Sequence, residues 1–410
     1  MTEDILPLEG LKILELSHIV AGPSCGLILA DLGADVIKIE QPDTGDTSRS
    51  HPNHGSTFFA YNRNKQSLAL NLKSAEGKEI FRRLVERSDV VIDNYAAGAL
   101  TRLGVDYDWG SQVNPRIIYC SLKGFLPGPY GSRPFLDELA QMAGGLAYMT
   151  GPPGRPLRAG ASIIDIGAAT YGVVGILAAV YRRQLTGRGE SIQSGLFETT
   201  VFWMNQHIAR TQLSGVTPAP FAAAKDSMGS VMGWGVYQLF PTRDGRDVFI
   251  AVTANRHWAR LCEVLGFDDW ARDSTFDSNT KRAQQRILIA DRIASVTVNY
   301  GFDELTRMLD EAEVPYAPVN TPTDLVDDPQ MNGRDHWMPL DVPGHPGLKV
   351  PALPMSMGDT RYEVRLQPPR LGEHTDEILE SVGYAPEEIQ ALKSTGVVRR
   401  TDELLDVESE

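Results

Sequence analysis

Short apolar runs alternate with helical apolar spacing over the first 125 residues of the chain. The runs are rich in valine, isoleucine and leucine, and they predict strands at residues 12–16, 36–39, 67–71, 90–93 and 117–121. Apolar positions three and four residues apart predict helices at residues 22–32 and 75–86. Strands that alternate with helices are typical of βαβ units. The fold class expected is therefore α/β with a parallel sheet.

The pattern continues to residue 214 and then changes. Helical spacing predicts helices at residues 137–146, 166–185 and 196–213, with a strand at 191–193. After Ser214, the segment Gly-Val-Thr-Pro-Ala-Pro-Phe predicts a linker. A hairpin at 236–240 and 248–252 follows, with three helical segments after it, which is typical of a compact α+β unit. We expect a first part over residues 1–214, a small α+β domain over 215–320 and a C-terminal part over 321–410.

The charge balance excludes some classes of ligand. Lysine and arginine number 39 against 53 aspartates and glutamates, so the net charge is -14. Recognition of duplex nucleic acid needs a concentrated basic face, so we expect no nucleic-acid partner. The longest apolar stretch, residues 166–181, is shorter than the roughly 20 residues that cross a bilayer, which predicts a buried helix and no membrane partner. Any anionic ligand must therefore meet a local cluster of donors.

Cysteine usage and the absence of cofactor motifs narrow the chemistry. Cys25, Cys120 and Cys262 form no CxxC pair, so neither a disulfide framework nor a zinc ribbon is predicted. The acidic N-terminus lacks the features of a signal peptide, and a cytoplasmic location is expected. No GxGxxG or GxxxxGK[ST] occurs, and His51 and His54 form an isolated HxxH. We therefore predict no dinucleotide, ATP or metal site.

Asp165 is the residue that local physics singles out. It stands directly before the apolar helix expected at residues 166–185. One interpretation is an N-cap, because an aspartate at a helix start accepts backbone N–H bonds. The other is a functional carboxylate, because the same N–H donors can keep it ionised and can stabilise an oxyanion beside it. Asn94, Tyr95 and Arg102 follow a predicted strand end, where α/β sheets bind ligands.

Seven separated segments carry a family resemblance that spans nearly the whole chain. They are Pro-Leu-Glu-Gly-Leu-Lys-Ile-Leu from residue 7, Ala-Gly-Pro from 21 with Leu-Gly-Ala-Asp-Val-Ile-Lys-Ile-Glu from 32, Asn-Arg-Asn-Lys from 62, Asp-Asn-Tyr from 93, Gly-Ile-Leu-Ala-Ala from 175 with Thr-Gly-Arg-Gly from 186, Val-Pro-Tyr-Ala-Pro-Val from 314 and Leu-Gly-Glu-His-Thr from 371. Taken in this order, the chain resembles the class III CoA-transferases of the CaiB/BaiF type. That family includes formyl-CoA transferase and carnitine CoA-transferase, and it shares its fold with α-methylacyl-CoA racemase.

The resemblance implies an architecture and a set of site residues. It implies a Rossmann-like large domain made from both chain ends and a smaller middle domain. It also implies an interlocked dimer, formed by two copies of this chain or by this chain and a homologous subunit. Asp165 matches the family's catalytic aspartate, so the resemblance favours a nucleophile over a cap. The expected CoA contacts are Ile19, Val20, Ala21, Leu70, Lys73, Asn94, Tyr95, Ala99, Arg102 and Leu103. Coenzyme A enters as a thioester co-substrate, with no permanently bound cofactor expected.

Departures from the family pattern bear on the substrate. Val20 replaces a glutamine of formyl-CoA transferases, and Gln41 replaces an arginine that approaches the nucleotide, which weakens the formyl-specific interpretation. A run of glycines over the active site is represented here by Gly229, Gly233 and Gly235 together with Trp234. This segment is expected to form a lid over a bulkier, partly apolar acyl group, or Trp234 belongs to the core of the small domain.

The expected activity is transfer of CoA from an acyl-CoA donor, with succinyl-CoA as one candidate, to an organic acid. The resemblance implies aspartyl anhydride and aspartyl-CoA thioester intermediates on Asp165. One alternative is racemase-type proton exchange, but Leu136 stands where the racemase branch has a histidine, and exchange needs a base on each face of the carbon. Another alternative is a non-catalytic acyl-CoA-binding partner subunit.

Overall fold

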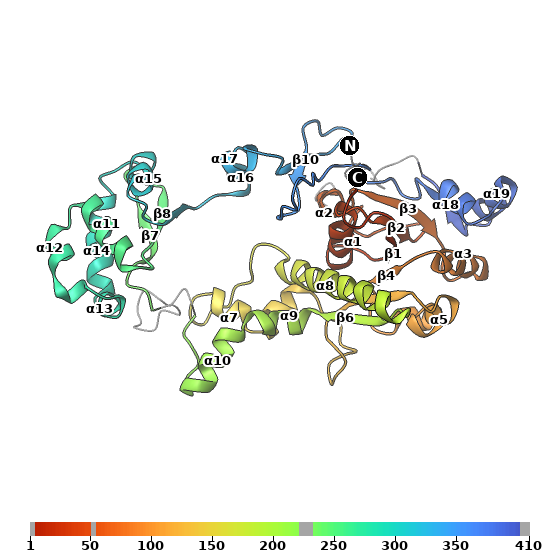
Figure 1. Ribbon diagram of the computed structural model, residues 1–410, viewed down its shortest axis with the longest axis horizontal. Helices are drawn as coiled ribbons and strands as arrows, with labels where there is room; N and C mark the ends of the chain where they lie inside the picture. Colours follow the sequence, from red (N-terminus) through yellow and green to blue (C-terminus); the bar gives the residue numbers. More distant parts are fainter. Residues whose placement is uncertain (1–4, 51–54, 221–232, 402–410) are drawn as a thin grey trace. The chain divides into compact units, whose positions relative to one another are not determined.

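The computed structural model describes residues 5–50, 55–220 and 233–401. The chain divides into two compact units (Figure 1). Unit 1 contains Met1–Leu146, Ala159–Met204 and Gln330–Glu410, and unit 2 contains Ala147–Arg158 and Asn205–Pro329. Both ends of the chain therefore contribute to the same unit.

A seven-stranded sheet forms the centre of unit 1. Its strands are β1 (Lys12–Leu16), β2 (Asp35–Glu40), β3 (Lys65–Leu70), β4 (Val90–Asp93), β5 (Ile118–Lys123), β6 (Ser191–Gly195) and β12 (Val398–Arg399). The strand order is β12-β3-β2-β1-β4-β5-β6, with every neighbouring pair parallel except β12 and β3. Strand order reverses direction at β1 and β4, which is the position where α/β sheets bind ligands beyond the carboxyl ends of the strands.

The helices of unit 1 come mainly from the connections between these strands. They are α1 (Ala21–Asp31), α2 (Ser56–Tyr61), α3 (Ala75–Glu86), α4 (Ala99–Leu103), α5 (Tyr107–Val113), α6 (Asp137–Ala143), α8 (Ile163–Thr186), α9 (Leu196–Trp203), α18 (Thr375–Ser381) and α19 (Pro386–Ser394). A short antiparallel hairpin, β10 (Trp337–Pro339) with β11 (Lys349–Pro351), packs against the phenylalanines of α2.

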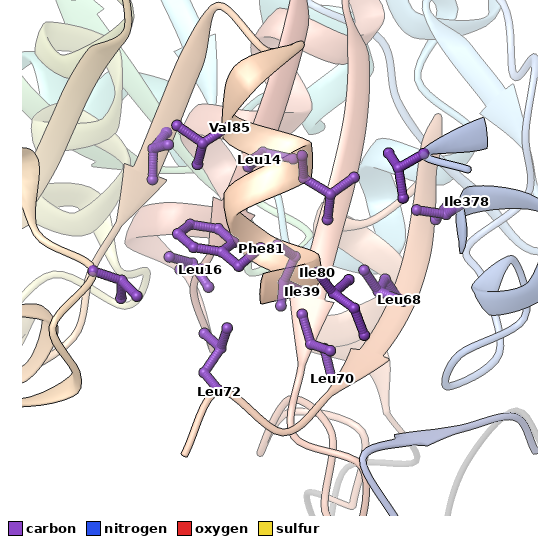
Figure 2. Packing of buried hydrophobic residues seen from close by; sticks show 14 of the residues in the cluster. Leu14, Leu16, Ile39, Leu68, Leu70, Leu72, Ile80, Phe81, Val85 and Ile378 are labelled. Carbon is purple, nitrogen blue, oxygen red and sulfur yellow. The ribbon is translucent and has the colours of Figure 1, made fainter. Parts of the chain in front are cut away.

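Alternate residues of the strands build a core on each face of the sheet. On one face, Leu14 and Leu16 of β1 pack against Phe81 and Val85 of α3, as Figure 2 shows. On the other face, Ile13 belongs to a cluster with residues of α1 and α8. The period of two along the strands explains this division, because successive side chains point to opposite faces. Helices therefore cover the sheet on both sides, as parallel sheets require.

The direction of α8 fixes where its first turn lies. Arg183, near the end of α8, donates hydrogen bonds to the carbonyl oxygens of Asp89 and Arg116, which lead into β4 and β5. The end of α8 is therefore at the amino edge of the sheet. Ser194, close to the carboxyl end of β6, donates a 2.8 Å hydrogen bond to the carbonyl oxygen of Ala168 in the first turns of α8. The first turn of α8 therefore lies at the carboxyl edge.

Asn64 ties the C-terminal part of the chain to the sheet. Its side-chain oxygen accepts hydrogen bonds from the backbone N–H groups of Arg365 and Leu366, at 2.7 and 3.0 Å. Its amide donates to Asp31 and to the carbonyl oxygen of Glu363. Asn64 also has a positive φ of 60°, a conformation that asparagine tolerates better than most residues. The Asn-Arg-Asn-Lys segment is thus a structural clamp.

Unit 2 has its own sheet and core. Its strands are β7 (Tyr237–Pro241), β8 (Asp247–Ala251) and β9 (Tyr316–Pro318), and all neighbours are antiparallel. Its helices are α10 (Asn205–Ser214), α11 (Asn255–Leu265), α12 (Asp268–Arg272), α13 (Asn279–Gln284), α14 (Arg286–Thr297), α15 (Phe302–Glu311) and α16 (Pro322–Val326), with a 3-10 turn at Ser274–Phe276. The helices α7 (Leu146–Thr150) and α17 (Pro329–Asn332) stand at the boundaries between the units. Trp258, Trp270 and Phe276 stack within the core of unit 2.

Most of the predicted elements are confirmed, with four exceptions. The helix expected at 137–146 ends at Ala143, and the three helical segments expected after the hairpin are five helices, α11 to α15. The expected helix at 166–185 begins at Ile163, so Asp165 lies inside the first turn and Ser162 is the N-cap. The cap interpretation of Asp165 is therefore wrong. The expected helix at 196–213 is interrupted at Met204 and forms α9 and α10. Among the described residues, α8 alone is long and apolar enough to cross a membrane, and its buried face packs on the sheet and α1.

Candidate active site

Asp165 stands at the carboxyl edge of the sheet without a hydrogen-bond donor. It is the third residue of α8 and is partly buried. Within the described part of the chain, its carboxylate accepts no hydrogen bond from a side chain or a backbone N–H. A carboxylate in this position is unusual, because the first N–H groups of a helix normally attract it. Its oxygens are therefore available to react.

Asp137 takes the helix donors that Asp165 leaves unused. Its Oδ2 accepts hydrogen bonds from the backbone N–H groups of Ile164, at 2.8 Å, and of Asp165, at 3.1 Å. Asp137 is the first residue of α6 and is buried. Ala140 of α6 packs with Ile164 in a small apolar cluster, which brings α6 against the start of α8. A carboxylate from a different helix therefore caps α8.

The surroundings of Asp165 favour its neutral form. Burial raises the pKa of Asp165, and the negative charges of Asp137 and Glu138 raise it further, to about 7. Burial disfavours the charged form because the carboxylate loses water, and a nearby like charge disfavours it by repulsion. A carboxylate with a raised pKa is more basic and hence a stronger nucleophile when ionised. The electrostatics therefore suit Asp165 to covalent chemistry.

Tyr61 is a neighbour of Asp165 that the sequence did not indicate. It is the last residue of α2 and is partly buried. Burial raises the pKa of the Tyr61 phenol, and the Asp165 carboxylate adds to this rise. The phenol therefore remains a neutral hydrogen-bond donor in the field of Asp165. No spacing pattern connects positions 61 and 165, so only the folded chain reveals this pair.

A pocket of about 270 Å³ opens at the carboxyl ends of β1 to β4. Four of the expected CoA contacts line it, namely Leu70, Lys73, Tyr95 and Leu103. Gln41, which the sequence also singled out, lines it as well. The remaining lining residues were not expected from the sequence, namely Ser17, His18, Ile39, Glu40, Thr44, Gly45, Asp46, Thr47, Asn71 and Leu72. His18 stacks on Tyr95 with ring centroids 5.6 Å apart, so the pocket has a flat aromatic wall suited to a heterocyclic base.

Buried ion pairs neutralise the acidic residues of this pocket. Glu40 pairs with Arg49, with a Glu40 Oε2 to Arg49 Nε distance of 2.7 Å. Asp46 pairs with Lys38 at 2.9 Å. Burial alone would raise the pKa of Asp46, but Lys38 outweighs it and holds that pKa well below its usual range. Lys73 is exposed at the pocket, and within the described residues it makes no ion pair. The pocket can therefore accept a phosphate group.

The loop after β1 has a fixed conformation beside the pocket. Asn94 accepts a hydrogen bond from the backbone N–H of His18 at 3.0 Å and donates one to its carbonyl oxygen at 2.8 Å. Asp46 accepts from the backbone N–H of Ile19 at 3.1 Å. Ile19 has a φ of 67°, which is strained for a β-branched side chain. Val20 and Ala21 follow as the buried start of α1.

The remaining expected contacts lie elsewhere. Ala99 lines a second, smaller pocket at β4, β5 and β6, and Arg102 is exposed with its guanidinium donating to the carbonyl oxygen of Ala97. Gly235 belongs to unit 2, where its N–H donates to Asn279. Asn279 also donates to the carbonyl oxygen of Gly233, and Trp234 between the two glycines is half-buried.

Some expected residues lie outside the described part of the chain. Gly229, His51 and His54 are among them, so the structure gives no account of these positions. Among the residues described, no group of three His, Cys, Asp or Glu side chains could hold a metal ion. The three cysteines are buried as free thiols. Asp165 with its acidic neighbours and the pocket at β1 to β4 lie at the same edge of the sheet.

Comparisons with known proteins identify the family of the chain. Residues 8–375 match the family described as CoA-transferase family III. The succinate–glutarate CoA-transferase of Agrobacterium fabrum is 31% identical over 388 residues, covering 91% of this chain and 95% of that protein. The succinyl-CoA:mesaconate CoA-transferase of Haloarcula marismortui is 33% identical over 392 residues, covering 92% and 96%. A crystal structure of a CAIB/BAIF family protein from Brucella suis has a TM-score of 0.80 and 32% identity, covering 92% of this chain and 99% of that one.

The shared fold and sequence place the protein among the enzymes that transfer CoA. The chain belongs to CoA-transferase family III, as its resemblance to the CaiB/BaiF type predicted. Its activity is the transfer of CoA between an acyl-CoA and an acid.

Proposed function

We propose that the enzyme moves CoA from an acyl-CoA donor, with succinyl-CoA as the first candidate, to a small organic acid through covalent intermediates on Asp165. The observation that carries this proposal is the Asp165 carboxylate itself. It has no hydrogen-bond donor among the described residues, and its pKa is raised to about 7. It lies at the same edge of the sheet as the pocket at β1 to β4. These features support a nucleophile over a structural cap.

The proposed reaction moves one negative charge at each step. An oxygen of ionised Asp165 attacks the thioester carbon of the donor, the carbon–sulfur bond breaks, and CoA leaves as a thiolate. The product is a neutral mixed anhydride between Asp165 and the donor acid. The thiolate then attacks the Asp165 acyl carbon, and the donor acid leaves as a carboxylate. The resulting aspartyl-CoA thioester reacts with the acceptor acid by the reverse sequence, which splits one hard step into easier ones.

The pocket at β1 to β4 is proposed to hold the nucleotide end of CoA. Tyr95 and His18 provide the aromatic wall for the adenine ring. Lys73 provides a positive charge for phosphate, and Arg102 on α4 is a second cation in the proposed set. The strained Ile19 and the following Val20 and Ala21 present backbone to the ligand, while Asn94 fixes this loop from behind.

Succinyl-CoA is the preferred donor because two of the similar proteins use succinate or succinyl-CoA by name. Gln41 lines the pocket at the position where formyl-CoA transferases carry an arginine, so a formyl-specific site is disfavoured.

The segment with Gly233, Trp234 and Gly235 is proposed to cover the intermediates, since both the anhydride and the thioester would hydrolyse in water. A cytoplasmic location, where succinyl-CoA is available, completes the proposal.

Two other functions make different predictions. Racemase-type exchange needs a second base opposite Asp165, but Leu136, at the racemase histidine position, is 63% exposed and carries no titratable group. A non-catalytic partner subunit would bind acyl-CoA without any covalent product. Among the acidic groups near Asp165, Asp137 is engaged in capping α8, which further disfavours the racemase.

The test is mass spectrometry of the purified chain after incubation in D₂O with acyl-CoAs and free acids. Transfer predicts a CoA-sized adduct on the Asp165 peptide, CoA on a new acid and no deuterium at the α-carbon. Deuterium without CoA exchange would instead indicate a racemase, and binding without either product would indicate a silent subunit. Asp165→Asn keeps the size of the side chain and removes the nucleophile, so it should fold and form no adduct. Retained transfer in this variant would overturn the assignment of Asp165.

We also propose that two copies of the chain form a homodimer. One face of α8 carries exposed apolar side chains three or four residues apart, namely Tyr171, Val174, Leu177, Tyr181 and Leu185. Their exposed fractions run from 37% to 74%, more than an isolated soluble surface normally presents in one stripe. Tyr181→Asp should therefore weaken self-association in analytical ultracentrifugation, whereas Ile287→Asp in α14 is the matched exposed control. If the chain instead pairs with a homologous chain, neither the wild type nor the variants should self-associate.

A further inference from the structure

Asp137 combines two features that are not needed together for folding. It is a buried carboxylate, and it faces the backbone of the residue proposed to react. Its Oδ2 accepts from the N–H groups of both Ile164 and Asp165, so two of the four free donors at the start of α8 are satisfied. A serine or asparagine would satisfy the same donors without a charge. The negative charge at position 137 therefore calls for a separate explanation.

The charge acts on Asp165 because the two carboxyl groups share one helix end. Asp137 removes the N–H groups that would otherwise stabilise ionised Asp165. Its own charge then repels the charge of Asp165, and this repulsion is stronger in partly buried surroundings than in water. The other titratable groups that face Asp165 are Glu138 on α6, which is exposed, and the phenol of Tyr61 on α2. Asp137 is the buried anion in this set.

We propose that Asp137 is a positioning residue that promotes acylation of Asp165, by holding the start of α8 with a negative charge instead of a neutral cap. This inference rests on the proposed covalent function of Asp165. In the first step, the negative charge leaves Asp165 with the thiolate, and the anhydride is neutral. In the second step, the donor acid carries the charge away, and the aspartyl thioester is neutral. Each covalent state therefore relieves the repulsion from Asp137, while the free carboxylate suffers it.

Gln141 holds Asp137 in the orientation that this role needs. It lies one turn further along α6 and is fully buried. Its amide donates to Asp137 Oδ1, and its side-chain oxygen accepts a 2.8 Å hydrogen bond from the backbone N–H of Ala159. With Oδ1 held in this way, Oδ2 points to the start of α8. Gln141 also offers a matched control, because its loss disturbs the geometry but keeps the charge of Asp137.

The experiment compares Asp137→Asn with Gln141→Met. In Asp137→Asn, the side chain keeps an oxygen that can cap α8 but loses its negative charge. In Gln141→Met, Asp137 keeps its charge and the side-chain volume at position 141 is similar, but the hydrogen bond to Asp137 Oδ1 is lost. Intact-mass spectrometry then measures the fraction of enzyme trapped as a covalent adduct with succinyl-CoA and no acceptor. Rates are measured from pH 5 to 9. Asp165→Asn serves as the reference without any adduct.

For Asp137→Asn, we expect the pH of half-maximal activity to fall by about one unit, and the ratio of adduct to free enzyme to fall about tenfold, which is the factor for one pKa unit. Gln141→Met should keep the wild-type midpoint, whatever its rate. Equal midpoints in Asp137→Asn and wild type, or an equal shift in both variants, would overturn the proposal. If Asp137→Asn fails to fold, Asp137→Ser tests the same charge. Adduct formation by Asp165→Asn would reject the proposed function itself, which is a different result.

Discussion

Asn94 at the end of β4 clamps the backbone of His18 at the end of β1 through two hydrogen bonds, one in each direction. The amide donates to the His18 carbonyl at 2.8 Å, and its oxygen accepts from the His18 N–H at 3.0 Å. Because β1 and β4 are adjacent parallel strands, one side chain can fix the loop that follows the other strand. The next residue, Ile19, has a left-handed backbone, which persists only where neighbours enforce it.

Asn94→Ala should release this loop and weaken binding of acyl-CoA without unfolding the enzyme. Both bonds to His18 are lost, and Ile19 can relax to an unstrained conformation. Since each hydrogen bond contributes about 1 kcal/mol, we expect the KM for acyl-CoA to rise about tenfold or more, with a smaller change in kcat. Initial rates over a range of acyl-CoA concentrations measure this split. A KM equal to that of the wild type would show that the clamp does not shape the binding site.

Lys73→Ala should raise the KM for acyl-CoA and reduce its dependence on salt. Lys73 is the exposed cation at the pocket, and exposed charge pairs contribute up to about 1 kcal/mol, or roughly fivefold in affinity. Lys12 at the start of β1 is an exposed lysine at the opposite edge of the sheet, so Lys12→Ala is the control of equal charge. The comparison of KM at 20 mM and 300 mM salt is the measurement. Identical salt dependence in the two variants would remove Lys73 from the phosphate site.

The sequence was sufficient to predict the strands, but not the polar contacts between residues that are far apart in the chain. Alternation and helical spacing are local signals, so β1 and α3 have the predicted bounds. The cap of α8 is not local, because Asp137 reaches the N–H of a residue 28 positions later. The loop residues Thr44 and Thr47 show no periodicity, and they reach the pocket only because β2 ends beside β1. Long-range polar contacts therefore could not be predicted from local sequence patterns and are seen only in the folded structure.

The position of Asp165 shows how one local expectation failed. An aspartate before an apolar run normally predicts a cap. Here the helix begins earlier, at Ile163, because the preceding isoleucines pack with Ala140 and Leu196. The family resemblance favours a nucleophile at this residue, which is the role proposed above. Helix boundaries are the least reliable feature of a sequence pattern, and two or three residues decide between the two roles.

Asp165→Asn should stabilise the folded enzyme at neutral and alkaline pH. The folded pKa of about 7 lies above the ordinary value of 3.8, so the folded state binds the proton more tightly than the unfolded chain. Stability is therefore lost as the pH rises from about 4 to about 7, and it levels off above 7. At 1.36 kcal/mol for each pKa unit, removing the charge should add on the order of 2 to 4 kcal/mol at pH 8. Urea unfolding at pH 8 and pH 4.5 measures the difference, which should fall to about 1 kcal/mol at the lower pH, because the pKa of the unfolded carboxyl lies only about 0.7 pH units below this pH and the folded carboxyl is neutral. A loss of stability at pH 8 would instead show that the folded protein stabilises the ionised form of Asp165.

The pH dependence of the rate should report the same group. Attack on the thioester needs ionised Asp165, so kcat should rise about tenfold per pH unit below pH 6 and approach a plateau above pH 8. Glu138→Gln should move this midpoint down by less than Asp137→Asn, because Glu138 is exposed and its charge is screened by water. Stopped-flow or coupled assays across this range give the midpoint. A midpoint near 4 would mean that the carboxylate is solvated during turnover.

Glu15→Gln should strongly destabilise unit 1, because Glu15 lies between two buried lysines. Its carboxylate contacts Lys38 at 3.0 Å and Lys65 at 2.8 Å, and all three side chains are fully buried. Burial lowers the pKa of Lys65 to about 8 although Glu15 opposes this shift. Without Glu15, Lys65 loses its ion-pair partner, and we expect a loss of about 3 to 5 kcal/mol in the free energy of unfolding.

The double variant Glu15→Gln/Lys65→Met separates charge from packing. Methionine removes the unpaired ammonium, while Lys38 keeps its contact with Asp46. Urea unfolding should therefore show recovery of more than half of the loss, because replacing a buried ion pair by an apolar group is often neutral. If the double variant were as unstable as Glu15→Gln, the loss would come from Lys38, which also loses its 3.0 Å contact with Glu15, and not from Lys65.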